Sequence, residues 1–149
     1  MEIAELRAFR QQFYPDIEVE IILDPGLKNK GFRGLASEGK IALSEIITSG
    51  DIAYWEKLLP GIKINAIGAL YLNFLHELGH VFLGHVKAKS GTAQQTDKHK
   101  TLLGVDDAVK RLPEDLQETA RRILEERELM CDAFAIVEFM RLLKLGVFV

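Results

Sequence analysis

Cysteine is almost absent from this chain, since Cys131 is the only one among 149 residues. A single thiol cannot form a disulfide within the chain, so a disulfide framework is excluded. Scarce cysteine is typical of proteins in a reducing compartment, which predicts a cytoplasmic location. Hydrophobic residues make up 48% of the sequence, which is enough to build one core. We therefore predict a single domain over residues 1–149.

The chain also lacks an excess of charge of either sign. It carries 19 basic and 22 acidic residues, which gives a formal net charge of −3. This balance provides no general electrostatic reason to bind nucleic acid or an anionic membrane surface, so neither is expected as a direct partner. The first six residues, Met1–Leu6, are acidic and amphipathic, which is not typical of a signal peptide.

One apolar run, residues 62–86, is long enough to raise the question of a membrane span. Asn73, His76, Glu77 and His80 interrupt it. A run with ionisable groups near its centre does not suit a lipid-facing helix. We interpret it instead as the buried central helix of a soluble domain, over about residues 64–85.

The remaining pattern predicts an α+β fold. Alternating apolar and acidic residues predict a strand over 17–21, and two further strands are predicted over 31–36 and 40–43. Together these give a small antiparallel sheet. Other helices are predicted over 2–13, from a cap at 49–51 to about 59, and from 113 toward 145. The most polar stretch, 87–112, is interpreted as a surface loop.

The most informative segment lies inside the apolar helix and reads His76-Glu77-Leu78-Gly79-His80. Histidines four positions apart lie on one helix face, so both imidazoles can converge on one ion, as in the HExxH zinc motif. Glu77 lies beside that face, where a carboxylate can take a proton from the attacking water. Burying such groups without partners costs on the order of 2 kcal/mol or more each, and a metal removes that cost. The alternative is a pair of core histidines bonded to backbone.

A catalytic zinc site needs a third protein ligand and one open position. His85 lies five residues after His80, about 140° away around a helix of ~3.6 residues per turn, so it points elsewhere. A better candidate is Glu128, which shares one face of the last predicted helix with Asp132. Glu128 can supply a carboxylate ligand while Asp132 orients a ligand imidazole. Glu125, one turn earlier, is the fallback ligand.

The pair of motifs, HELGH at 76–80 and ExxxDxFA at 128–135, resembles the ImmA/IrrE-type metallopeptidases of the gluzincin group. The resemblance covers roughly residues 17–140. It implies a zincin-like fold, in which the small sheet packs against an active-site helix and a second ligand-bearing helix. It also implies Zn²⁺ held by His76, His80 and Glu128, with Glu77 as the catalytic base and Asp132 in support.

The same resemblance implies a zinc-dependent endopeptidase that acts on a protein or peptide substrate. In such relatives the substrates are DNA-binding repressors. This chain has no DNA-binding motif of its own, so a repressor would be a separate protein. Minigluzincins share both motifs and are the nearest competing family. Tyr71 and His99 are candidates for stabilising the oxyanion only by their residue type.

Two other classes of protein remain as alternatives. Peptide deformylases also carry HExxH, but they need a cysteine ligand upstream of that helix, whereas Cys131 lies well downstream. The second alternative is a non-catalytic, zinc-stabilised interaction or regulatory domain of the phage or mobile-element type. Zinc content alone does not separate that domain from an enzyme, whereas access of water to the metal and a cleavage assay do.

Overall fold

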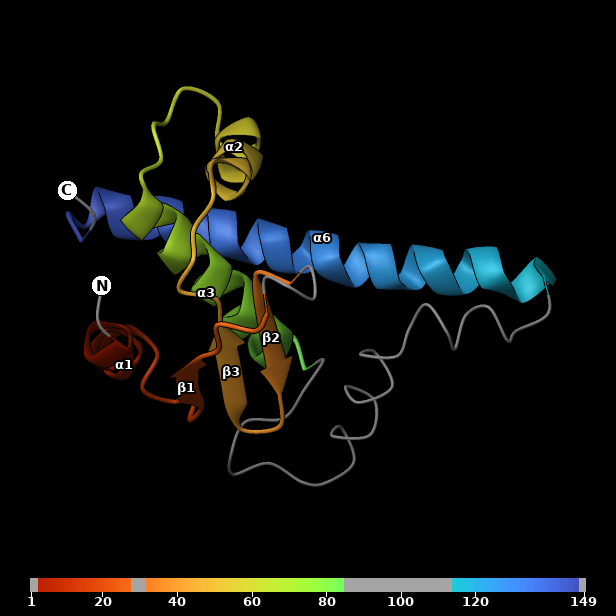
Figure 1. Cartoon of the computed structure of the whole chain (residues 1–149), viewed down its shortest axis with the longest axis horizontal. Coiled ribbons are helices and arrows are strands. Elements are labelled where there is room, and N and C mark those ends of the chain that lie inside the picture. The colour runs from red at the N-terminus through yellow and green to blue at the C-terminus, as the bar shows by residue number, and fades with distance from the viewer. Residues whose placement is uncertain (1–2, 28–31, 85–113, 148–149) are drawn as a thin grey trace.

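The computed structural model describes residues 3–27, 32–84 and 114–147 (Figure 1). Within them the chain forms four helices and three strands, which confirms the α+β class. In chain order these are α1 (Ile3–Phe13), β1 (Glu20–Leu23), β2 (Gly34–Ser37), β3 (Lys40–Leu43), α2 (Ser49–Leu58), α3 (Ala66–Phe82) and α6 (Glu114–Lys144). The predicted surface loop at 87–112 lies outside the described residues.

Helix α3 lies at the centre of the fold, with the sheet on one side and α6 on the other (Figure 1). It packs against β2 and β3, against the long helix α6 and also against α2, while α1 packs against β1. Leu72, Phe74, Leu75 and Leu78 of α3 have no solvent exposure. Because elements cover α3 on several sides, its sequence is apolar around most of its circumference. None of the described helices is both long and apolar enough to cross a membrane.

The sheet is mixed, so the prediction of an antiparallel sheet was wrong. Its strand order is β1-β3-β2, in which β2 pairs antiparallel with β3 but β1 pairs parallel with β3. The chain leaves β1 at Leu23 and enters β2 at Gly34, and both residues align with Leu43 at one end of the sheet. The β2–β3 turn then returns the chain between the two earlier strands. This order leaves β2 at an edge, against α3.

The first predicted strand, 17–21, is displaced to 20–23 by a side chain. Arg10 donates from Nη1 to the carbonyl oxygen of Ile17 at 2.9 Å, and Ile17 donates its backbone N–H to Tyr14. These bonds occupy backbone groups that a strand would need, so pairing with β3 begins at Glu20. The second strand is likewise displaced, from the predicted 31–36 to 34–37.

The bounds of the predicted helices agree with the structure to within a few residues. Capping residues and a glycine nearby in the sequence explain where the helices begin and end. Thr48, rather than the predicted 49–51 segment, caps α2, in a reciprocal capping box with Asp51. Asn65 caps α3 by accepting a hydrogen bond from the backbone N–H of Gly68 at 2.7 Å. Helix α3 ends at Phe82, and Gly84 then adopts a left-handed conformation with φ of 79°.

Candidate metal centre

The two histidines of the HExxH motif lie on one face of α3, as predicted from their spacing. The ring centroids of His76 and His80 are 5.2 Å apart, with an angle of 77° between the ring planes. His80 is only 5% exposed, and the His76 side chain is 13% exposed. Both imidazoles therefore lie at the inner boundary between α3 and α6, where a third ligand from α6 can reach them.

Gly79 allows α6 to approach this part of α3 closely. A Cβ atom at position 79 would lie 3.2 Å from Cδ1 of Phe134 and 3.4 Å from Cα of Cys131. The first distance is tighter than most Cβ contacts and the second is ordinary contact, so a side chain at position 79 would require its neighbours on α6 to shift by a few tenths of an ångström. The glycine within the motif therefore has a packing role, because it lets α6 bring Glu128 to the histidines.

Glu128 contacts both histidines, as the sequence predicts for the third ligand. Its Oε2 accepts a hydrogen bond from Nε2 of His76 at 2.8 Å, and its Oε1 lies 3.2 Å from Nε2 of His80. The three side chains offer ligand atoms that all lie within 4.8 Å of one another. The side chain of Glu128 nevertheless remains 59% exposed, so the group is open to solvent on the side of α6.

The spacing of these atoms suits a small divalent ion. A tetrahedral ion with bonds of ~2.0–2.1 Å holds neighbouring ligand atoms about 3.3 Å apart. The two carboxylate–imidazole contacts, at 2.8 and 3.2 Å, lie close to this spacing, and all three ligand atoms lie within 4.8 Å of one another. The group can thus bind a metal ion, and its two imidazole nitrogens and one carboxylate oxygen are ligands of intermediate softness.

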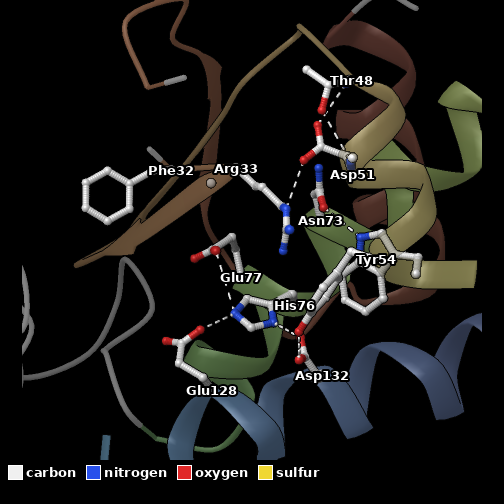
Figure 2. Close-up of a pocket in the computed structure, with 13 residues that line it drawn as sticks. Phe32, Arg33, Thr48, Asp51, Tyr54, Asn73, His76, Glu77, Glu128 and Asp132 are labelled. Carbon is white, nitrogen blue, oxygen red and sulfur yellow. Dashed lines mark hydrogen bonds and ion pairs between the residues drawn. The ribbon is translucent and has the colours of Figure 1, made fainter. Parts of the chain in front are cut away.

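Asp132 supports His76 from the opposite side of the ring. Nδ1 of His76 donates to Oδ1 of Asp132 at 2.7 Å, which leaves Nε2 directed at Glu128 (Figure 2). The hydroxyl group of Tyr54 donates to the other oxygen of Asp132. Burial lowers the pKa of His76, but the hydrogen bonds to Asp132 and Glu128 outweigh burial and raise this pKa to about 10. Without a metal, His76 is therefore a cation at neutral pH.

Electrostatics also favour an ionised Glu128. Partial burial opposes ionisation, but the hydrogen bonds from His76 and His80 outweigh it and hold the pKa of Glu128 well below its ordinary value. A ligand carboxylate must be deprotonated, so this residue is in the form that binds metal.

The side chain of Glu77 extends from α3 toward the edge strand β2. Its Oε1 lies 3.9 Å from Nε2 of His76, and the backbone N–H of Ala36 donates to its carboxylate. Burial raises the pKa of Glu77, and the negative charge of Glu128 adds to this rise. The charges of the two histidines and the hydrogen bond from Ala36 act in the opposite direction but are outweighed. A buried carboxylate with a raised pKa beside the ligands can accept and return a proton.

Gly34 provides the space that Glu77 occupies. A Cβ atom at position 34 would lie 2.8 Å from Cγ of Glu77 and 3.0 Å from Cδ2 of Leu43. Real Cβ atoms essentially never approach another atom at 2.8 Å. The edge strand can therefore lie directly against the carboxylate only because position 34 has no side chain.

A cavity of about 570 Å³ opens over the candidate centre (Figure 2). His76, Glu77, Glu128 and Asp132 line one part of it. The remainder is lined by the start of β2 and the two residues before it, by α2 and its capping residue, and by one residue of α3, namely Phe32, Arg33, Gly34, Thr48, Gly50, Asp51, Tyr54, Trp55 and Asn73. The volume falls within the usual range of about 300–1,000 Å³ for small-molecule sites.

Other residues considered from the sequence do not join this group. Glu125, the fallback ligand, is exposed and is not among the three clustered ligands. Tyr71 packs edge-to-face on Phe9 at 4.8 Å, in a different part of the fold. Cys131 is buried, and burial, aided by nearby carboxylates, raises the pKa of its thiol. His85 and His99 lie outside the described residues.

Helix α2 and the approach to β2 contribute residues that were not predicted from the sequence. Tyr54 reaches Asp132 across 78 positions of the chain, and Trp55 donates from Nε1 to the side-chain oxygen of Asn73 at 2.9 Å. Arg33 pairs with Asp51 at 2.9 Å. Arg33, Tyr54 and Trp55 belong to no local motif, although the interruption of an apolar helix by Asn73 was a visible signal.

Comparison of the chain with protein-family models, curated proteins and solved structures found no match. The class of this protein is therefore defined only by its fold and its candidate site. The described residues form an α+β fold with a small mixed sheet, and His76, His80 and Glu128 form a group that can hold a metal ion.

Proposed function

We propose that this chain is a zinc-dependent endopeptidase of the zincin-like, ImmA/IrrE type. One observation carries the proposal, namely that His76, His80 and Glu128 converge from two helices while Glu77 lies beside them. This arrangement supplies three protein ligands for a metal and a carboxylate in the position of a general base. The zinc ion, the peptidase activity and the family are all inferences from these residues and their resemblance to known motifs.

Zinc is the metal that best suits the group. Two histidines and one glutamate are the ligand set of several catalytic zinc sites, which keep one coordination position open. The exposed side of Glu128 and the adjacent cavity provide that access. When bound, zinc supplies a Lewis acid that polarises a carbonyl group and lowers the pKa of water.

Glu77 acts as general base and then as general acid. Its carboxylate accepts a proton from the attacking water and passes it to the nitrogen of the leaving amine. The Ala36 N–H and the packing against Gly34 fix the carboxylate in position, so no reorganisation is needed at each turnover. Asp132 and Tyr54 hold the ring of His76 with Nε2 directed at the centre.

The substrate is a protein or peptide in extended conformation. The strand β2 lies at an edge of the sheet beside Glu77, so a peptide can add to it through backbone hydrogen bonds. A DNA-binding repressor, encoded as a separate protein, is the candidate substrate suggested by the resemblance. The nearly balanced charge of the chain fits a protein substrate rather than nucleic acid.

The alternative, a zinc-stabilised interaction domain without activity, calls for a site that is closed to substrate. A structural zinc site has four protein ligands. The only such group found among the described residues contains three, and a cavity adjoins it. These features favour the enzyme.

The experiment compares the wild type with Glu77→Gln after each protein is loaded with zinc. Both are incubated with a pool of random octapeptides, and new peptide termini are identified by mass spectrometry. We expect about one zinc per chain in both proteins, with cleavage by the wild type and none above background by the variant. The matched control, Glu126→Gln, changes an exposed carboxylate of α6 and should cleave as the wild type does.

Three results would count against the proposal. Full cleavage by Glu77→Gln would remove Glu77 as the base. A wild type that binds no zinc would remove the metal centre. A wild type that binds zinc but cleaves nothing in the pool or in a candidate repressor would favour the interaction domain.

A further inference from the structure

Arg33 is held rigidly at the wall of the cavity that contains the candidate metal centre. Its Nε donates to Oδ1 of Asp51 at 2.9 Å, and its guanidinium carbon lies 4.0 Å from the ring centroid of Tyr54. Asp51 is only 3% exposed and is fixed in turn by the capping box at the start of α2. An arginine constrained by both an ion pair and an aromatic face loses little conformational freedom on binding a ligand.

The outer end of this guanidinium is available to a ligand. The hydrogen bond to Asp51 uses Nε, and within the described part of the chain neither terminal nitrogen of Arg33 has a hydrogen-bond acceptor. Arg33 is 39% exposed and lines the same cavity as His76 and Glu77 (Figure 2). Four N–H groups in a planar fork therefore remain unused on the cavity side.

The first turn of α2 adds positive potential to the same wall. Thr48 and Gly50, at the start of this ten-residue helix, line the cavity next to Arg33. A helix N-terminus carries roughly half a positive charge and favours anions. Asp51 offsets the charge of Arg33, and the helix end adds its partial positive charge to this wall of the cavity.

We propose that Arg33 binds a carboxylate group of the substrate and thereby determines which peptides the site accepts. This inference rests on the proposed peptidase function, which it extends to a substrate class. The carboxylate belongs either to an aspartate or glutamate side chain near the cleaved bond or to the free C-terminus of the substrate. Arg33 is a specificity residue in this assignment and takes no part in proton transfer.

Donor counting favours a carboxylate over a peptide carbonyl as the ligand of Arg33. A carbonyl oxygen has two lone pairs, whereas a carboxylate has about four acceptor positions in the plane of its two oxygens. The two terminal nitrogens of a guanidinium match that plane in a bidentate pair. A single carbonyl would leave part of this fixed fork without an acceptor.

The test measures binding rather than cleavage, so its outcome is separate from that of the peptidase proposal. Zinc-loaded Glu77→Gln protein is titrated into fluorescein-labelled octapeptide pools, and fluorescence anisotropy gives an average Kd for each pool. The first pair of pools lacks aspartate and glutamate and ends in either a free carboxylate or an amide. The second pair is amidated and contains either one glutamate or one glutamine per peptide.

We expect about tenfold tighter binding of the carboxylate member in one of these pairs. A preference in the first pair identifies the C-terminus as the source, and a preference in the second identifies an acidic side chain. Equal binding within both pairs would overturn the inference. That result would leave the peptidase proposal standing, because zinc content and cleavage are measured independently.

The preference must also depend on Arg33. In the same background Arg33→Ala should abolish it, and Arg33→Lys, which keeps a charge for Asp51 but lacks the fork, should reduce it at least about threefold. The matched control is Arg141→Ala, which removes a surface arginine paired with Glu138 and should keep the preference. If Arg33→Ala fails to fold because Asp51 loses this ion pair, the lysine variant decides the question. An unchanged preference in that variant would overturn the assignment.

Discussion

Asp132 accepts a hydrogen bond from Nδ1 of His76 at 2.7 Å, although 56 positions of the chain separate the two residues. This bond joins α6 to α3 on the side of the imidazole that faces away from Glu128. A carboxylate in this position keeps the proton on Nδ1 and leaves Nε2 for a metal. Because Asp132 is 6% exposed, water cannot readily replace it as the acceptor.

Removing this support should weaken metal binding. Asp132→Ala is expected to lower zinc affinity by about 10- to 100-fold, the usual cost of losing such a partner. Tyr54→Phe removes only the hydroxyl group that holds Asp132, so its effect should be smaller. Competition with a chromophoric chelator measures both. An unchanged affinity in Asp132→Ala would show that the bond does not orient the ligand.

Two glutamates one turn apart on α6 should differ sharply in their effect on zinc. Glu128→Ala removes a proposed ligand, so its loss of affinity should exceed the factor of about 100 expected for an outer partner. Glu125→Ala removes an exposed carboxylate outside the group and should bind zinc as the wild type does. Equal losses in the two variants would mean that Glu128 acts only through general negative charge.

Zinc affinity should increase with pH because His76 must lose a proton to bind. In the metal-free protein its pKa is raised to about 10, so the imidazole is protonated throughout the neutral range. Binding of zinc then releases one proton from His76. Below this pKa, the apparent zinc affinity should therefore fall about tenfold for each pH unit. Chelator competition at several values between about pH 6.5 and about pH 8.5 tests this. A flat profile would show that His76 is already neutral.

Gly34→Ala should impair cleavage while largely sparing the metal. The added methyl group would lie 2.8 Å from Cγ of Glu77, which is buried and cannot move aside freely. We expect displacement of the carboxylate, a large loss of activity and a destabilisation of about 1–3 kcal/mol, as for other overpacked sites. Zinc content should remain near that of the wild type. Ser37→Ala, on the same strand, serves as the control, and equal activity in the two variants would contradict the close-approach argument.

The sequence predicted the parts of the site that lie within single helices. The spacing of His76 and His80, and that of Glu128 and Asp132, fixes which side chains share a face. The structure brings these two faces together, which the spacing within each helix could not determine alone. Proximity of two helices depends on side-chain packing between them, and here on the absence of a side chain at Gly79.

The parts that the sequence did not predict depend on long-range pairing. The parallel pairing of β1 with β3 follows from the strand order and leaves no local signal in short strands. The places of Arg33 and Tyr54 on the cavity wall depend on how α2 and the approach to β2 meet at the sheet edge. Each pairs with a residue that is distant in sequence, so neither belongs to a short motif.

The three clustered ligands come from parts of the chain that are 48 positions apart, at His80 and Glu128. An ion held between them would join two distant parts of the chain and, by binding only the native state, would stabilise that state by mass action. At a free metal concentration about 1,000 times its Kd, that stabilisation is about 4 kcal/mol, a large fraction of the roughly 5–15 kcal/mol by which native proteins are stable. The lifetime of this protein in a cell would then follow the supply of the ion.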